Sequence, residues 1–152
     1  MTEKNIKDVI GNVLSGDAQK RALDFVTYLE LNDMPPNCVH GDLWMAGYND
    51  NCVCYIHIDG AAQNPGPWTI WPDGSYASEP EGFAIDEHTK QLALAHVNIC
   101  GSCGEACSPG TRKTVFGKDF DNVCGATMAF NNPDDEALNC VKKLMEMRKR
   151  AI

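Results

Sequence analysis

The first part of the chain has two stretches whose apolar residues recur at helical spacing. From about Thr2, apolar residues lie three and four positions apart, until Ser15 and Gly16 interrupt the pattern. A second run starts at Asp17, a residue type that caps helices well, and stops at the sequence NDMPP. We therefore predict two amphipathic helices. Their apolar stripes are Ile6, Val9, Ile10, Val13 and Leu14 in the first, and Ala22, Phe25, Val26 and Leu29 in the second.

The middle of the chain changes to the alternation typical of strands. DLWMAGY and CVCYIHI flank Asn49–Asp50–Asn51, which predicts a β-hairpin. After a Gly- and Pro-rich loop over 60–67, PWTIW predicts another strand, turned back at Pro72–Asp73–Gly74. Alternation divides the second hairpin strand between two faces, with Cys52, Cys54, Ile56 and Ile58 on one and Val53, Tyr55 and His57 on the other.

The last part of the chain predicts a helix, a strand and a final helix. DEHTKQLALAHVNI predicts a helix from about Asp86, and CGATMAF alternates as a last strand. Asn132, Pro133 and two aspartates then open the final helix with a cap, a proline and acidic first-turn residues. The expected stripes are Leu92, Ala95, His96 and Ile99 in the first of these helices, and Leu138, Val141, Leu144 and Met145 in the final one.

This order of elements predicts an α+β fold. We expect one domain over residues 1–152, with N-terminal helices, a small antiparallel sheet, a C-terminal helix, and a Cys-rich metal-binding loop before the last strand. A length of 152 residues with 43% apolar content suits a single hydrophobic core.

Composition favours a cytoplasmic protein. MTEKNIKDVI lacks the apolar run of a signal peptide, and no stretch approaches the ~18 consecutive apolar residues of a membrane span. In a reducing compartment, eight cysteines indicate metal ligands, reactive thiols or buried small side chains more than disulfides. Residues 1–100 carry 5 basic and 14 acidic side chains, a net of −9, whereas residues 101–152 carry 8 and 7, a net of +1. Nucleic acid is therefore not an expected partner.

The strongest chemical signal is the cysteine spacing in NICGSCGEACSPGTRK. Cys100, Cys103 and Cys107 form a C-x2-C-x3-C pattern, and the glycines and proline between them permit tight turns around a centre. We predict a structural zinc site in a Cys-rich loop over 97–124. The expected fourth ligand is Cys124, and the alternative is His96, one helical turn before Cys100.

Other interpretations of this loop stay open. Iron or an iron–sulfur cluster also takes four cysteines, although neither common ferredoxin spacing is present. Redox thiols are disfavoured, because the pair follows a predicted helix C-terminus, where the dipole does not lower a thiol pKa. The loop could also hold no metal. Arg112, Lys113 and Lys118 either offset the negative charge of a zinc tetrathiolate or are ordinary surface cations.

Aromatic residues gather in the predicted sheet and give a second candidate site. They either line a pocket for a small ligand or form core and cross-strand pairs. We expect Cys52, Cys54 and Cys140 to pack in the core and His40, His57 and His88 to be solvated or hydrogen-bonded. The sequence shows no nucleophile–histidine–acid set and no phosphate loop, so an enzyme is not favoured. The pocket candidates are Trp44, Trp68, Trp71 and Tyr55.

The stretch from CGSCGEACSPG to CVKKLMEMRK, with TIWPDG upstream, resembles a group of small bacterial cytosolic proteins that carry this cysteine signature. The order of elements ending in TMAFNNPDDEALNCVKKLMEMRKR is also similar to the YdhG-like proteins, small α+β domains of which some are linked to iron handling. The cysteine loop is not part of the YdhG-like pattern, so that likeness implies a fold and no functional residue. We expect a zinc-stabilised binding or accessory protein. The alternatives are an iron or iron–sulfur accessory protein, and a small-molecule-binding or enzymatic role through the aromatic pocket.

Overall fold

The computed structural model describes residues 5–40, 43–58, 68–72, 86–99, 111–115 and 118–151. These residues have the predicted α+β fold with a C-terminal helix. The helices are α1 (Ile6–Val13), α2 (Gly16–Leu31), α3 (Glu87–Ala95) and α4 (Asp135–Ala151). The strands are β1 (Pro36–His40), β2 (Leu43–Tyr48), β3 (Asn51–Ile58), β4 (Trp68–Pro72), β5 (Val97–Ile99), β6 (Thr111–Val115), β7 (Lys118–Met128) and β8 (Phe130–Asn131).

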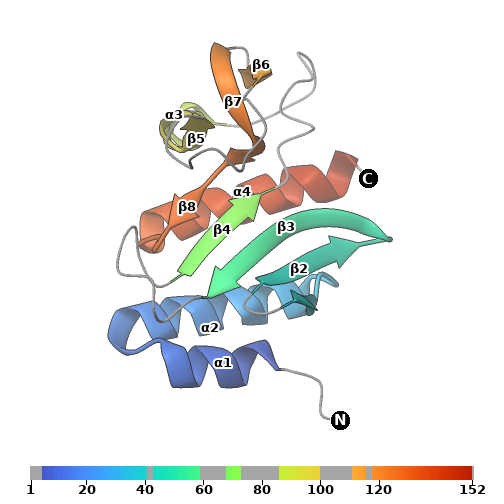
Figure 1. Cartoon of the computed structure of the whole chain (residues 1–152), viewed down its shortest axis with the longest axis vertical. Coiled ribbons are helices and arrows are strands. Elements are labelled where there is room, and N and C mark those ends of the chain that lie inside the picture. The colour runs from blue at the N-terminus through green and yellow to red at the C-terminus, as the bar shows by residue number, and fades with distance from the viewer. Residues whose placement is uncertain are drawn as a thin grey trace.

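The described strands form two antiparallel sheets. The larger sheet has the order β1-β2-β3-β4-β8, and the smaller one has the order β5-β7-β6. Helix α1 contacts β1 and β3, α2 contacts β1, and α4 contacts β3 and β4. In Figure 1, α2 and α4 lie behind the larger sheet, and no described helix lies in front of β2, β3 and β4. Helix α3 packs against α4 and leads into the smaller sheet.

The helical stripes predicted from the sequence form much of the core. The stripes of α2 and α4 are buried throughout, which confirms the predicted helical phase of both. In α1, Ile6 and Ile10 are buried, as is Leu14 directly after it, but Val13 is 36% exposed because only one side of this two-turn helix faces the sheet. The cluster of buried side chains that forms this core extends to Met128 and Phe130, so residues of β7 and β8 contribute to the same core.

The predicted hairpin is confirmed, with one correction to its faces. Asn49 and Asp50 have positive φ angles of 48° and 64°, which suit a tight turn between right-twisted strands. A bulge between Ala46 and Gly47 leaves Val53 as an extra residue of β3. Val53 is therefore buried beside Cys54, contrary to strict alternation, and Cys52 is only half-buried.

The first two helices begin at other residues than predicted. Helix α1 starts at Ile6, four residues later than expected, because Asn5 has an extended backbone and its side-chain oxygen accepts an amide hydrogen bond (2.8 Å). Helix α2 starts at Gly16, so the N-cap residue is Ser15 and not Asp17. Asp17 lies in the first turn, where its carboxylate still complements the helix dipole.

The final helix also begins later than predicted. Asn132 has a φ of 44° and is not its cap. Asp134 takes that role, because its Oδ1 accepts a hydrogen bond from the Ala137 amide (2.8 Å) and helix α4 starts at Asp135. Pro133 precedes the helix and is buried.

Strand pairing overrides the predicted helix and loop in the region after α3. The predicted helix from about Asp86 is α3, which Asp86 caps, but α3 ends at Ala95, and residues 97–99 form β5 in place of helix. Residues 111–115 and 118–124, expected in a loop, are strand, because β5 and β6 both pair with β7. The expected last strand over 124–130 is divided at Ala129 between β7 and β8. Strand β1, at the edge of the larger sheet, is not predicted, because Pro35 and Pro36 at its start indicate a break.

Several predicted features lie outside the described residues, namely residues 1–4, the loop over 60–67, the turn at 73–74 and the cysteine segment 100–110. In the described part of the chain, no helix combines the length and the apolar content needed to cross a bilayer.

Candidate functional site

The smaller sheet positions both ends of the cysteine segment. Strand β5 ends at Ile99 and strand β6 begins at Thr111, so these residues border segment 100–110. Ile99 pairs with Val123 of β7 from one side, and Thr111 pairs with Val123 from the other side. The segment that contains Cys100, Cys103 and Cys107 therefore starts and ends beside the same residue of the central strand. The three cysteines themselves lie outside the described residues.

Cys124 directly follows Val123 in β7; its backbone is described and its side chain is not. Cys100 directly follows Ile99. Each of these two cysteines is thus one peptide unit, about 3.8 Å between Cα atoms, from one member of the Ile99–Val123 pair. Two predicted ligands that are 24 positions apart in the sequence are attached to paired strand residues.

His96, the alternative fourth ligand, follows α3 and is half-buried. Its Nδ1 lies 2.7 Å from the Leu92 carbonyl oxygen, and its ring stacks on Phe130 with centroids 4.2 Å apart. Its backbone oxygen accepts a hydrogen bond from the Ala129 amide (3.0 Å). These contacts orient the imidazole against the core residue Phe130.

Arg112 and Lys118, which follow the cysteine segment in the sequence, contact residues of the β6–β7 hairpin. Arg112 lies 3.3 Å from Asp119 and 3.9 Å from Asp121. The Thr114 hydroxyl donates to Asp119 at 2.6 Å and is the main cause of that carboxyl's lowered pKa. Lys118 lies over the ring of Phe120. Arg112 thus has carboxylate partners in the β6–β7 hairpin.

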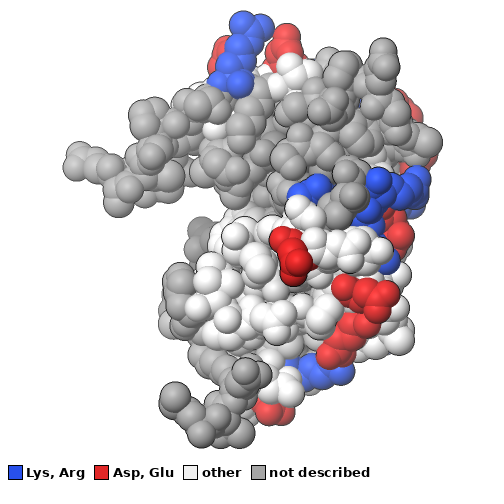
Figure 2. All heavy atoms as spheres, turned by 90° about the vertical axis from the view of Figure 1, so that its right-hand side faces the viewer, with Lys and Arg blue, Asp and Glu red and all other residues white. Residues whose placement is uncertain are grey.

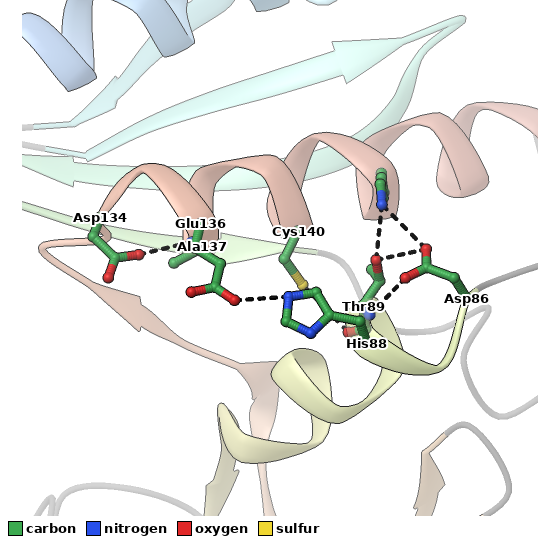
Figure 3. Close-up of polar contacts among 8 residues, drawn as sticks. Asp86, His88, Thr89, Asp134, Glu136, Ala137 and Cys140 are labelled. Atoms are coloured by element: carbon green, nitrogen blue, oxygen red, sulfur yellow. Dashed lines mark hydrogen bonds and ion pairs between the residues drawn. The ribbon is translucent and has the colours of Figure 1, made fainter.

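A polar contact between α3 and α4 was not predicted (Figure 3). Asp86 accepts hydrogen bonds from the Thr89 hydroxyl (2.7 Å), the Thr89 amide (3.0 Å) and Lys143 (3.1 Å). These bonds, the Thr89 hydroxyl foremost, hold the pKa of Asp86 well below its usual range. His88 lies 2.7 Å from Glu136, so it is a hydrogen-bonded histidine, as expected. No sequence spacing indicated the contacts of Lys143 with Asp86 and of His88 with Glu136, because these residues are far apart in the sequence, whereas Asp86 and Thr89 are three positions apart.

A cleft of about 220 Å³ opens beside this contact, at the start of α4. Its lining combines apolar and polar side chains. Although His96 and two carboxylates line it, no group of three or more His, Cys, Asp or Glu residues in the described part of the chain is arranged to hold a metal. The lining residues are Leu92, His96, Asn131, Asn132, Pro133, Asp134, Glu136 and Ala137.

Two other cysteines are core residues, as predicted. Cys54 is fully buried and Cys140 is 2% exposed. Burial raises the pKa of the Cys140 thiol to about 11, and its Sγ donates to the Thr89 carbonyl at 3.6 Å. Burial likewise raises the pKa of Cys54. Both are therefore protonated at neutral pH and are poor nucleophiles or ligands.

The aromatic candidates divide between the two faces of the larger sheet. Trp44 and Trp68 are 1% exposed and belong to the core, and Trp68 packs against Phe25 with ring centroids 6.3 Å apart. Trp71 is half-buried on the other face, and Tyr55 beside it is 37% exposed. The core interpretation therefore applies to Trp44 and Trp68, and only Trp71 and Tyr55 lie on the face without a described helix.

Comparison of the chain with protein-family models, with curated proteins and with solved structures finds no match. The two resemblances described from the sequence therefore stay predictions.

Proposed function

We propose that this protein is a non-enzymatic binding or accessory protein stabilised by one structural zinc ion. Cys100, Cys103, Cys107 and Cys124 are the proposed ligands, and His96 is the alternative to Cys124. Four thiolates suit zinc, which prefers sulfur and nitrogen donors in tetrahedral sites. A reducing, cytoplasmic compartment, in which thiols persist, belongs to the same proposal.

The observation that supports this proposal is the pairing of both Ile99 and Thr111 with Val123. Segment 100–110 has 11 residues, and the two residues that border it pair with the same residue of β7, next to Cys124. Such a segment is suited to close around a single metal ion. When bound, the zinc would cross-link the end of β5 to the middle of β7. Because these strands also carry contacts to the core through Met128, the zinc would stabilise the packing of the smaller sheet.

Elemental analysis of protein purified without chelator tests the proposal, with one zinc per chain expected. Cys103→Ser should lose the metal and lower the melting temperature. Cys140→Ala is the matched control, since Cys140 is buried in the core; it should keep the metal and cost about 1 kcal/mol for a small core truncation.

Protein that contains no zinc, or two variants with equal metal content, would refute the zinc site. Iron in place of zinc, with visible absorption in protein prepared without oxygen, would favour the iron or iron–sulfur alternative.

A further inference from the structure

The cleft at the start of α4 is bordered by three elements of the fold. Leu92 belongs to α3 and His96 follows that helix, Asn131 belongs to β8, and Glu136 belongs to the first turn of α4. The volume of about 220 Å³ is below the roughly 300–1,000 Å³ of sites for drug-sized ligands. A ligand that fits this cleft is therefore small.

His96 gives the cleft an acceptor nitrogen. The Leu92 carbonyl can only accept a hydrogen bond, so the 2.7 Å contact places a proton on Nδ1 of His96. In the neutral imidazole the other nitrogen, Nε2, is then an acceptor. Stacking on Phe130 fixes the plane of the ring, and no described residue forms a hydrogen bond with Nε2. This nitrogen is therefore available to a donor group of a ligand.

Two carboxylates of the α4 N-terminus line the same cleft (Figure 3). Oδ1 of Asp134 accepts a hydrogen bond from the Ala137 amide, and Oε1 of Glu136 lies 2.7 Å from Nε2 of His88. The second oxygen of each carboxylate has no hydrogen-bond partner in the described part of the chain. The lining thus offers two negatively charged acceptors in addition to His96.

The nearby basic side chains are already paired. Arg21 lies 3.1 Å from Asp135, and Lys143 lies 3.1 Å from Asp86. No lysine or arginine is among the described residues that line the cleft. Figure 2 faces the side on which α4 ends and shows lysine and arginine side chains there, and the two ends of this 17-residue helix lie about 25 Å apart. The basic residues of the last turn are Arg148, Lys149 and Arg150.

This arrangement favours a cationic ligand over an anionic one. A helix N-terminus attracts anions, but the carboxylate of Asp134 already caps α4 and accepts the Ala137 amide. An anion in the cleft would therefore meet two carboxylates and no basic lining residue. A cation with N–H groups would instead match the available acceptors.

The ligand must be longer than a single ion. In the described part of the chain, no three His, Cys, Asp or Glu side chains are arranged to hold a metal, so the acceptors of the cleft do not surround one point. They suit a molecule whose donors are spaced along a short chain. Leu92, Pro133 and Ala137 also line the cleft and provide apolar contact for the methylene groups of such a chain.

We propose that this cleft binds a short aliphatic amine that carries a second hydrogen-bond donor at its other end. The ammonium group lies beside the carboxylates of Asp134 and Glu136, and the second donor binds Nε2 of His96. The proposal goes beyond the zinc site and does not depend on it, because Cys124 is the proposed fourth zinc ligand.

The test uses three compounds with the same number of non-hydrogen atoms. 4-Amino-1-butanol has both the charge and the second donor, pentylamine lacks the second donor, and 1,4-butanediol lacks the charge. Backbone amide shifts are recorded by NMR during titration into the full chain, purified without chelator, at about 0.15 M salt to screen long-range attraction. The amino alcohol should give saturable shifts at Asn131, Asn132 and the first turn of α4. Each of the other two compounds should bind at least about threefold more weakly.

Variants of exposed residues test the assignment to the cleft. Glu136→Gln keeps the size of a 58% exposed side chain and removes its charge, so it should weaken binding of the amino alcohol at least about threefold. Asp8→Asn is the matched control, because it removes one negative charge from an exposed position of α1 outside the cleft. His88→Ala removes the partner of Glu136 but keeps the carboxylate. Both of these variants should retain the affinity of the wild type.

Equal affinity for the amino alcohol and 1,4-butanediol would overturn the proposal, since the carboxylates would then contribute nothing. Equal affinity for the amino alcohol and pentylamine would overturn the role of the second donor. Equal losses in Glu136→Gln and Asp8→Asn would show attraction to the net negative charge of the protein and not to this cleft. Shifts confined to other parts of the chain, or shifts that do not saturate, would also refute the site.

Discussion

The imidazole of His96 lies parallel to the ring of Phe130, with centroids 4.2 Å apart and planes 17° apart. This contact joins the end of α3 to β8, and the Nδ1 bond to Leu92 holds the ring in place. His96 thereby has a structural role that is independent of any metal.

We expect His96→Ala to lower the free energy of unfolding by about 1–2 kcal/mol, through loss of the stacking and of one hydrogen bond. The zinc content should stay unchanged, because Cys124 is the proposed fourth ligand. Urea unfolding and elemental analysis of one preparation measure both effects. His88→Ala is a control at a 69% exposed side chain, and it should change neither. Loss of zinc in His96→Ala alone would instead identify His96 as the ligand.

Chelation should leave the protein folded but less stable. Zinc binding would order a glycine-rich segment, so part of its binding energy becomes folding energy. The core around Phe25, Trp68 and Leu144 is formed by helices α2 and α4 and the larger sheet, and it should persist. Treatment with EDTA should therefore lower the melting temperature and preserve the far-ultraviolet circular dichroism spectrum. Complete unfolding would mean that the fold depends on the metal. An unchanged melting temperature would mean that no metal ion stabilises the protein.

The Tyr28 hydroxyl donates a 2.7 Å hydrogen bond to Glu146 and so ties α2 to α4. Because Tyr28 is only partly buried, we expect Tyr28→Phe to lower the free energy of unfolding by about 1–1.5 kcal/mol at neutral pH. Tyr48→Phe is the control, since the contact of Tyr48 with Lys149 involves the ring. Equal losses in both variants would contradict a specific contribution of the Glu146 bond.

The same tyrosine should make stability depend on alkaline pH. Burial and the bond to Glu146 raise the pKa of Tyr28 above its ordinary value of 10.0. The unfolded chain releases this proton first, so the stabilisation is complete below pH 10.0 and is lost as the pH rises above it. The wild type should lose stability between pH 10 and 11 by up to about 1.4 kcal/mol more than Tyr28→Phe does. Parallel losses in urea unfolding at these two pH values would contradict this assignment.

Asp86 should titrate with an abnormally low pKa because of Thr89 and Lys143. The Thr89 hydroxyl is the largest cause, so Thr89→Val should raise the pKa of Asp86 more than Lys143→Met does. Because the pKa of Asp86 is lowered in the folded state, its ionised carboxylate stabilises the fold at pH values above the ordinary pKa of 3.8. This stabilisation is lost as the pH falls below 3.8. Carboxyl NMR titration measures the pKa in each protein. A larger effect of Lys143→Met would show that charge, and not hydrogen bonding, dominates.

The candidate sites were only partly accessible from the sequence. Spacing indicated Cys100, Cys103 and Cys107, because ligands close in sequence must also be close in space. It could not show that Ile99 and Thr111 both pair with Val123, since strand register depends on contacts between distant segments. The aromatic candidates Trp44, Trp68, Trp71 and Tyr55 were likewise visible in the sequence, but their division between two faces required the sheet.

The sequence by itself determined the elements whose signals are local. The stripes of α2 and α4 and the turn at Asn49–Asp50 follow from 3.6-residue periodicity and from backbone conformations that asparagine and aspartate tolerate. Only the tertiary structure decided that Val97–Ile99 is strand and not helix, that residues 118–123 are strand and not loop, and that Val53 is buried. In each of these cases the deciding interaction is with a residue on another strand: Met128 for Val97, the residues of β6 for β7, and the Ala46–Gly47 bulge for Val53. Local periodicity contains no information about such partners, because strand hydrogen bonds are satisfied between segments and helix hydrogen bonds within one.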